Sequence, residues 1–246
     1  MRWFVALAFA VIASPVSAVE CRDMTYQGAE YTICEVNATR EGLRLFLRDP
    51  NTDKPLGSFA NIDSLLEPRG MRLDFAMNAG MYHQDRAPVG QYVEAGQEIS
   101  RVISSDGPGN FGLLPNGVFC IREGRADVFE TLRYLREKPG CDYATQSGPM
   151  LVIDSALHPR FLPDSDSRYV RNGVGTSKDG ARAWFVISNE PVTFHQFGSF
   201  FRDHLKTPQA LYFDGNISRL YAPEMERFDG GFPMGPMVGV VGDAGE

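Results

Sequence analysis

The chain has 246 residues, which is long enough to bury a sizeable hydrophobic core. Hydrophobic residues make up 43% and charged residues 22% of it, which excludes an intrinsically disordered chain and a membrane protein with many spans. The 25 glycines and 16 prolines favour a turn-rich, strand-rich fold over a helical bundle, and a net charge of −7 argues against nucleic acid as a partner.

The first 18 residues have the pattern of a secretory signal peptide. Arg2 precedes an apolar run at residues 3–13, and residues 16–18 provide the small and aliphatic positions that signal peptidase accepts. This run is too short to cross a bilayer, which takes about 20 residues, and no later stretch is long enough. We therefore expect cleavage after Ala18, a mature domain at residues 19–246 and a periplasmic or secreted location. An uncleaved anchor is the alternative.

All four cysteines, Cys21, Cys34, Cys120 and Cys141, follow the predicted cleavage site. An even number of cysteines in an exported protein indicates two disulfides, for which three pairings are possible. We favour Cys21–Cys34 and Cys120–Cys141, because each pair closes a short loop around turn residues. A zinc site is the alternative, but the sequence has no Cys-x-x-Cys or His-Glu-x-x-His pattern.

Short apolar runs bounded by turn residues predict a succession of strands. Asn116-Gly117 precedes one such run and indicates a hairpin, and Lys178-Asp179-Gly180 lies between two runs as the turn of another. The run at residues 72–77 leads directly into Asn78-Ala79-Gly80. The predicted strands cover residues 31–36, 43–48, 72–77, 118–121, 150–153, 170–176, 181–188 and 210–213.

One helix is predicted between the last two of these strands. Thr193 and Gln196 form a capping box at its start, and Pro208 ends it. With so little other helix, we expect an α+β fold: a single domain with a mixed, strand-rich sheet core and few helices. The helix presents one apolar face, made of Phe194, Phe197, Phe200, Phe201 and Leu205.

Four segments combine polar side chains with glycines in a way that packing alone does not require. Each lies beside an apolar run or at its end, where a strand commonly delivers a catalytic side chain. Their amide, hydroxyl, guanidinium and carboxylate groups suit a hydroxyl-rich substrate whose anion is bound by arginine. The segments are Asn78-Ala79-Gly80-Met81-Tyr82, Gln146-Ser147-Gly148-Pro149, residues 168–175 and Asp214-Gly215-Asn216-Ile217-Ser218.

These segments, in this order, resemble the motifs of the phosphodiester glycosidase family, and residues 109–111, 115–119 and 234–237 resemble an exported bacterial branch of it. The resemblance implies hydrolysis of a sugar-1-phosphodiester, and we expect no cofactor and no metal ion. One position departs from the family pattern Asp-Gly-Gly, because Asn216 adds a side chain that would narrow the pocket. A second Asp-Gly-Gly, at residues 229–231, follows no predicted strand and is interpreted as a loop. The matching motifs are Asn78-x-Gly80-x-Tyr82, Ser147-Gly148-Pro149, Arg171-Asn172-x-x-Gly175 with Asp179-Gly180, and Asp214-Gly215 with Ser218.

The chemistry of such a substrate suggests roles for these residues. The leaving group is a phosphate monoester, which needs little protonation as the glycosidic bond breaks. The usual pair of glycosidase carboxylates can then reduce to one carboxylate and one cation. We assign Asp214 as the nucleophile or the base that activates water, and Arg171 as the cation that holds the phosphate. The expected substrate-binding residues are Asn78, Gly80, Tyr82, Ser147, Gly148, Asn172, Gly175, Gly215 and Ser218.

Structural roles are the alternatives for the same residues. Asp214 can cap a turn, Arg171 can form a buried ion pair, and Asn78 can bond turn backbone. Asp85 and Glu190 are candidates for a second carboxylate. For the whole protein the alternatives are a non-catalytic carbohydrate or sugar-phosphate binding protein, and a metal-dependent phosphodiesterase, whose clustered Asp and His ligands the sequence lacks. No protein partner is evident.

Overall fold

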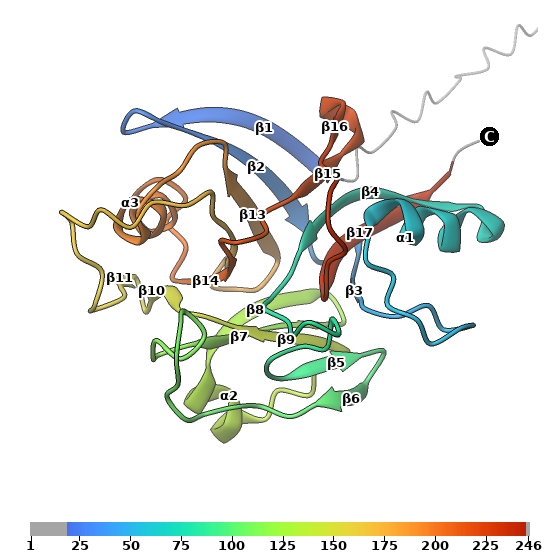
Figure 1. Ribbon diagram of the computed structural model, residues 1–246, viewed down its shortest axis with the longest axis horizontal. Coiled ribbons are helices and arrows are strands. Elements are labelled where there is room, and N and C mark those ends of the chain that lie inside the picture. The colour runs from blue at the N-terminus through green and yellow to red at the C-terminus, as the bar shows by residue number, and fades with distance from the viewer. Residues whose placement is uncertain (1–18, 245–246) are drawn as a thin grey trace, which may run out of the picture.

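The computed structural model describes residues 19–244, which form three antiparallel β-sheets and a few short helices (Figure 1). Sheet 1 has the order β1 (Val19–Tyr26), β2 (Ala29–Asn37), β13 (Arg182–Ser188), β12 (Asn172–Thr176), β14 (Gln209–Asp214), β10 (Met150–Ile153) and β11 (Ala156–Leu157). Sheet 2 has the order β16 (Arg227–Phe228), β15 (Leu220–Ala222), β4 (Met71–Asn78), β17 (Met237–Asp243) and β3 (Gly42–Phe46). Sheet 3 has the order β6 (Gln97–Ser100), β5 (Tyr92–Glu94), β9 (Tyr143–Ser147), β7 (Gly117–Arg122) and β8 (Arg125–Glu130).

The expectation of a mixed sheet is wrong, because every pair of named strands in the described residues is antiparallel. The predicted helix does connect two strands that run the same way, β13 and β14. However, β12 lies between them and pairs with both in antiparallel fashion. The fold is therefore mostly β, with helices as additions to the sheets.

The predicted helix is present as α3 (Phe194–Ser199), which continues into a π-helical turn, η2 (Phe200–His204). The capping box is confirmed, because Thr193 Oγ1 accepts from the Gln196 N–H and the Gln196 side chain accepts from the Thr193 N–H, both at 3.1 Å. Its apolar face packs on sheet 1, where the rings of Phe200 and Tyr31 stack at 4.4 Å. The other helices are α1 (Phe59–Leu66), η1 (Glu67–Arg69), α2 (Thr131–Glu137) and η3 (Pro223–Met225).

The three sheets share one hydrophobic core, to which each contributes phenylalanine. Phe185 of β13 lies 5.0 Å from Phe75 of β4 and 5.7 Å from Phe119 of β7, between ring centroids. Phe213 of β14 also contacts Phe119, at 6.2 Å. All four rings are fully buried. The residue that precedes Asp214 is thus held where the sheets meet.

Both favoured disulfides are confirmed, Cys21–Cys34 across β1 and β2 and Cys120–Cys141 between β7 and the segment before β9. The Lys178-Asp179-Gly180 turn is confirmed as well. The hairpin predicted at Asn116-Gly117 is wrong, because β7 turns into β8 at residues 123–124. Asn116 is instead buried, and its Nδ2 donates to the carbonyl of Phe111.

The predicted signal peptide lies outside the described residues. Among residues 19–244, no helix is long and apolar enough to cross a membrane.

Candidate active site

Asp214 ends β14, on a turn whose backbone holds its carboxylate. Oδ1 accepts from the N–H groups of Gly215 at 2.6 Å and Asn216 at 2.9 Å. The residue is 9% exposed, and this burial raises the pKa of the carboxyl above its ordinary value, while the backbone hydrogen bonds partly offset the rise. A base with a raised pKa binds a proton more readily, which suits the role predicted for Asp214.

Asn172 of sheet 1 and Asn78 of sheet 2 support this turn, and Ser218 supports it from the segment between β14 and β15. Asn172 Oδ1 accepts from the Asp214 N–H at 3.1 Å, and Asn172 Nδ2 donates to Asn78 Oδ1 at 3.0 Å. Asn78 Nδ2 donates to the carbonyl of Ile217 at 2.6 Å, and the Ser218 hydroxyl donates to the carbonyl of Asp214 at 3.0 Å. Asn78 and Asn172 are fully buried. Their amides thus bind the protein itself, and their predicted role at the substrate stays a prediction.

Sheet 3 reaches the same turn through the end of β9. Ser147 Oγ donates to the carbonyl of Phe213 at 2.8 Å and is fully buried. Gly148 follows, and a Cβ there would lie 2.6 Å from Asn116 Cβ. The four motif segments therefore gather around one turn, although they come from three sheets and from distant parts of the sequence.

The glycines of the motifs also have close protein neighbours. A Cβ on Gly80 would lie 2.9 Å from a threonine hydroxyl of β9, and one on Gly175 would lie 2.7 Å from the Phe201 ring. A Cβ on Gly215 would collide with the Tyr212 hydroxyl. At these positions the absence of a side chain is explained by packing, and an approach of substrate to the backbone stays a prediction.

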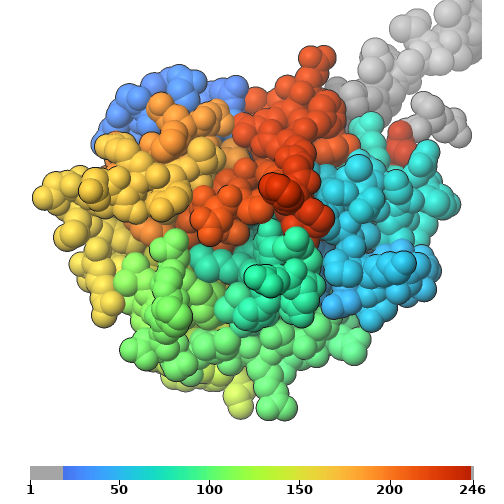
Figure 2. All heavy atoms as spheres, viewed as in Figure 1, coloured from blue at the N-terminus to red at the C-terminus, as the bar shows by residue number. Residues whose placement is uncertain are grey.

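A cavity of about 610 Å³ opens beside the Asp214 turn. Figure 2 shows the face on which its three segments meet, residues 81–89 in teal, 108–111 in green and 214–217 in orange-red. Of the predicted site residues, Asp214 and Tyr82 line it. The full lining is Met81, Tyr82, Arg86, Val89, Pro108, Gly109, Asn110, Phe111, Asp214, Asn216 and Ile217.

The charge of Asp214 acts on Tyr82, the other predicted site residue in the cavity wall. The pKa of the Tyr82 hydroxyl is raised, first by burial and then by the negative charge of Asp214, and the positive charge of Arg86 partly offsets this. The Tyr82 hydroxyl lies 3.5 Å from the carbonyl oxygen of Pro233. Tyr82 is half-buried, so one part of its ring packs in the protein interior and the other part lines the cavity.

Arg171 lies behind the Asp214 turn and is fully buried. Its Nε donates to the carbonyl of Val192 at 2.8 Å and its Nη2 to the carbonyl of Ser167 at 3.0 Å. The guanidinium also lies 3.6 Å from the ring centroid of Phe194 and bonds the Tyr212 hydroxyl. Burial lowers the pKa of this guanidinium, but an arginine side chain stays charged.

This placement differs from both roles considered for Arg171. No salt bridge found in residues 19–244 includes it, so the ion-pair alternative is wrong for that part of the chain. It does not line the cavity either, and with no exposed surface it has no direct route to a phosphate there. Its assignment as the phosphate ligand stays an untested prediction without support from the cavity geometry.

Three cavity residues were missed as candidates by the sequence analysis. Arg86 comes four residues after Tyr82, and a cation so close to a motif is a signal that could have been used. Asn110 belongs to the 109–111 segment that carried part of the family resemblance. Asn216, noted only for its departure from Asp-Gly-Gly, also lines the cavity, and a narrowing of the pocket by its side chain stays a prediction.

Asp214 is the one carboxylate among the residues that line the cavity. The two candidates for a second carboxylate, Asp85 and Glu190, are exposed and bind backbone N–H groups elsewhere. Asp229 of the second Asp-Gly-Gly binds Arg227 and the N–H of Leu220. Within residues 19–244, no group of three His, Cys, Asp or Glu side chains is arranged to hold a metal ion.

Two other sizeable cavities contain none of the motif segments. One of about 500 Å³ lies beside α1, and its carboxylate, Asp49, accepts from the Asn51 N–H and the Thr52 hydroxyl. The other, of about 440 Å³, lies between β8, α2 and the end of β12. The cavity at Asp214 is therefore the candidate active site.

Comparison with known proteins agrees with the motif reading. Residues 71–239 match the family model described as phosphodiester glycosidase. The uncharacterized protein YigE of Escherichia coli (strain K12) is 32% identical over 227 residues, which cover 89% of this chain and 84% of that protein.

Two solved structures share the fold. A hypothetical protein from Synechocystis superposes with a TM-score of 0.57 at 12% identity over 91% of this chain, which spans only 61% of that structure. The zebrafish N-acetylglucosamine-1-phosphodiester alpha-N-acetylglucosaminidase catalytic domain, auto-inhibited by its pro-peptide, also gives 0.57, at 11% identity over 90% of this chain and 81% of its own. At such identities the likeness concerns the fold alone.

Proposed function

The chain belongs to the phosphodiester glycosidase family, and on that premise we propose that it is an exported hydrolase that cleaves the glycosidic bond of a sugar-1-phosphodiester, with Asp214 as its catalytic carboxylate. One observation carries the proposal: the cavity beside the motif segments is lined by a single carboxylate, held at the end of a buried strand. A phosphate leaving group requires no second carboxylate to protonate it, so this wall suits the reaction.

The proposed reaction exchanges a carbon–oxygen bond at C1 of the sugar. The bond between C1 and the phosphate oxygen breaks, and its electron pair leaves with the phosphate. Water supplies the new oxygen on C1 and releases a proton. Asp214 acts in its ionised form, either by attacking C1 first or by accepting the proton from water, and the Gly215 and Asn216 N–H groups keep its carboxylate in place.

Export and substrate class have separate support. Two disulfides favour an oxidising compartment, and residues 1–18 have the signal-peptide pattern, so a periplasmic or secreted location is proposed. The name of the zebrafish relative in fold describes an enzyme for N-acetylglucosamine-1-phosphodiesters. Such compounds therefore belong in the first substrate panel.

The test uses residues 19–246 with both disulfides formed, a panel of sugar-1-phosphodiesters and release of free reducing sugar as the measurement. We expect release by the parent and a loss of at least about 100-fold in Asp214→Asn, the range for a missing general base. Asp229→Asn is the matched control, because it makes the same change in another Asp-Gly pair, outside the cavity wall. Turnover by Asp214→Asn at the parent rate would overturn the assignment.

Two other outcomes would point to the alternatives. Binding of sugar phosphates without any release would favour a carbohydrate-binding protein. Release that is blocked by a chelator, with solvent oxygen recovered in the phosphate, would indicate a metal-dependent phosphodiesterase that cuts the P–O bond.

A further inference from the structure

A sugar-1-phosphodiester brings a negative charge to the cavity, and more charge collects on the phosphate as it leaves. Such an anion needs hydrogen-bond donors and a positive charge at the place where the charge develops. The wall of the cavity contains one positively charged side chain, Arg86. The question is whether this side chain is fixed in position and free to bind an anion.

The backbone at Arg86 is held by a short closed loop. Tyr82 and Pro88 form an isolated bridge at its base, and the Val89 N–H donates to the carbonyl of Met81 at 3.0 Å. Within the loop the Arg86 N–H donates to the carbonyl of His83 at 2.9 Å, and the residue has a positive φ of 72°. The guanidinium carbon lies 5.4 Å from the centroid of the Tyr82 ring, which also lines the cavity.

The guanidinium of Arg86 is also available to bind an anion. Among residues 19–244, no hydrogen bond or salt bridge is found from the Arg86 side chain, which is half-buried. Arg171 and Arg219, which also lie near the Asp214 turn, already have hydrogen-bond partners. Arg171 donates to backbone carbonyls behind the turn, and Arg219 donates to the carbonyl of Phe232 at 2.5 Å. Neither of them lines the cavity.

We infer that Arg86 is the residue that binds the substrate phosphate, in place of Arg171, and that it stabilises the charge on the departing phosphate opposite Asp214. This inference rests on the proposed function. A planar guanidinium can donate two parallel hydrogen bonds to two phosphate oxygens, which a lysine cannot do. In this arrangement Asp214 faces C1 of the sugar, and Arg86 faces the phosphate on the other side of the bond that breaks.

The experiment compares Arg86→Gln and Arg86→Lys with the parent on two substrates of the same sugar, a phosphodiester and an uncharged 4-nitrophenyl glycoside. Arg86→Gln should lower kcat/KM for the phosphodiester by about 100- to 1000-fold, the usual effect of removing one such donor. The nitrophenyl glycoside should change by less than about threefold, and Arg86→Lys should recover part of the loss. Arg40→Gln removes the same charge from an exposed turn outside the cavity wall and is the matched control.

An equal loss on both substrates, or no loss on the phosphodiester, would overturn the inference. A binding measurement separates its failure from that of the proposed function. In calorimetric titration with a sugar 1-phosphate, Asp214→Asn should bind at least about tenfold more tightly than Asp214→Asn/Arg86→Gln. If the parent cleaves nothing, this ratio alone decides the role of Arg86, and equal affinities would exclude it.

Discussion

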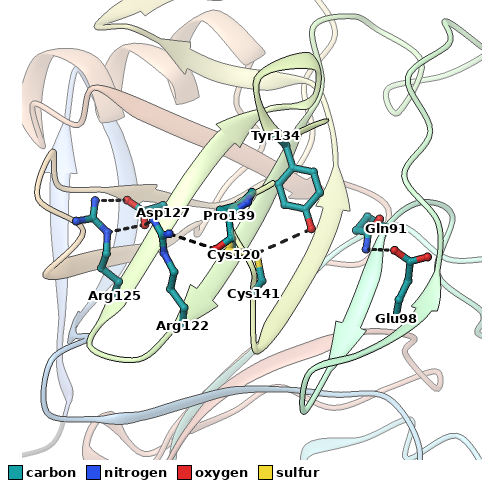
Figure 3. Close-up of a disulfide and its surroundings, with 9 residues drawn as sticks. All are labelled: Gln91, Glu98, Cys120, Arg122, Arg125, Asp127, Tyr134, Pro139 and Cys141. Atoms are coloured by element: carbon teal, nitrogen blue, oxygen red, sulfur yellow. Dashed lines mark hydrogen bonds and ion pairs between the residues drawn. A yellow bond between two sulfur atoms is a disulfide. The ribbon is translucent and has the colours of Figure 1, made fainter. Parts of the chain in front are cut away.

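Removal of the Cys120–Cys141 disulfide should destabilise the folded protein by a predictable amount. The bond, shown with its surroundings in Figure 3, closes a loop of 21 residues. This loop contains β8 and α2. The chain-entropy relation gives about 11 cal/mol/K for a loop of this length, or about 3 kcal/mol at 25 °C. In a chain of this size that corresponds to a fall in Tm of about 6–12 °C.

The assay is urea unfolding of residues 19–246 and of a Cys120→Ala/Cys141→Ala variant. The slope m should rise in the variant, because an unfolded chain without the cross-link expands and exposes more surface. This readout separates the cross-link from simple packing, since the loss of buried sulfur atoms would lower the free energy of unfolding without changing m. Cys120 is fully buried, so a packing contribution is present in any case.

A loss below about 1 kcal/mol, or a larger loss with unchanged m, would refute the reasoning. The interactions around the bond help to define what remains in the variant. Arg122 donates to Asp127 at 2.9 Å and to the carbonyl of Pro139 at 3.3 Å, and these two contacts hold the loop without the disulfide. The Tyr134 hydroxyl lies 3.9 Å from Cys141 Sγ, and the variant loses this contact together with the sulfur.

Three further predictions concern the motif residues. Gly175→Ala should lower the free energy of unfolding by about 1–3 kcal/mol and leave KM unchanged, because the new Cβ would overlap the Phe201 ring. Gly230→Ala is the control, since a Cβ there meets no other atom within 4 Å. A raised KM without a loss of stability would instead favour contact of Gly175 with the substrate. The acid limb of the pH–activity profile should lie above 3.8, because burial raises the pKa of Asp214 and turnover needs its ionised form. For the same reason ionised Asp214 disfavours the folded state, so Asp214→Asn should be at least as stable as the parent at pH 7, and the difference should shrink as the pH approaches 4. Urea unfolding of both proteins at pH 7 and at pH 4 measures this difference in stability. An acid limb of the activity profile at or below pH 3.8 would contradict the claim that burial raises the pKa of Asp214.

Features that depend on local sequence could be predicted. The capping residues Thr193 and Gln196, the apolar face that follows them and the turn at residues 178–180 lie within a few residues of their partners. Cys21 and Cys34 also belong to neighbouring strands. Local sequence patterns gave a wrong prediction where contacts with residues outside the pattern determine the structure. Asn116-Gly117 has the composition of a hairpin turn, but Asn116 is buried by contacts with Phe111 and Thr131, and the turn forms further along the chain.

The arrangement of the sheets could not be predicted in the same way. Nothing near β12 in the sequence shows that it inserts between β13 and β14, because pairing is decided by contacts that form only when the core closes. The same holds for Arg171. Its guanidinium was expected in the cavity, whereas the carbonyls of Val192 and Ser167 and the ring of Phe194, none of them adjacent in sequence, hold it behind the turn.

The motif residues and the residues of the cavity wall therefore differ in what they contact. Asn78, Asn172 and Ser147 use their polar atoms to bind backbone and one another, and together they fix the turn that carries Asp214. The wall that would meet the substrate comes largely from residues 81–89 and 108–111, which the motifs only touch. A chain can therefore keep the support of the Asp214 turn while these two loops change. The motifs assign this protein to its family, and we expect the choice of sugar and aglycone to depend on the loops at residues 81–89 and 108–111.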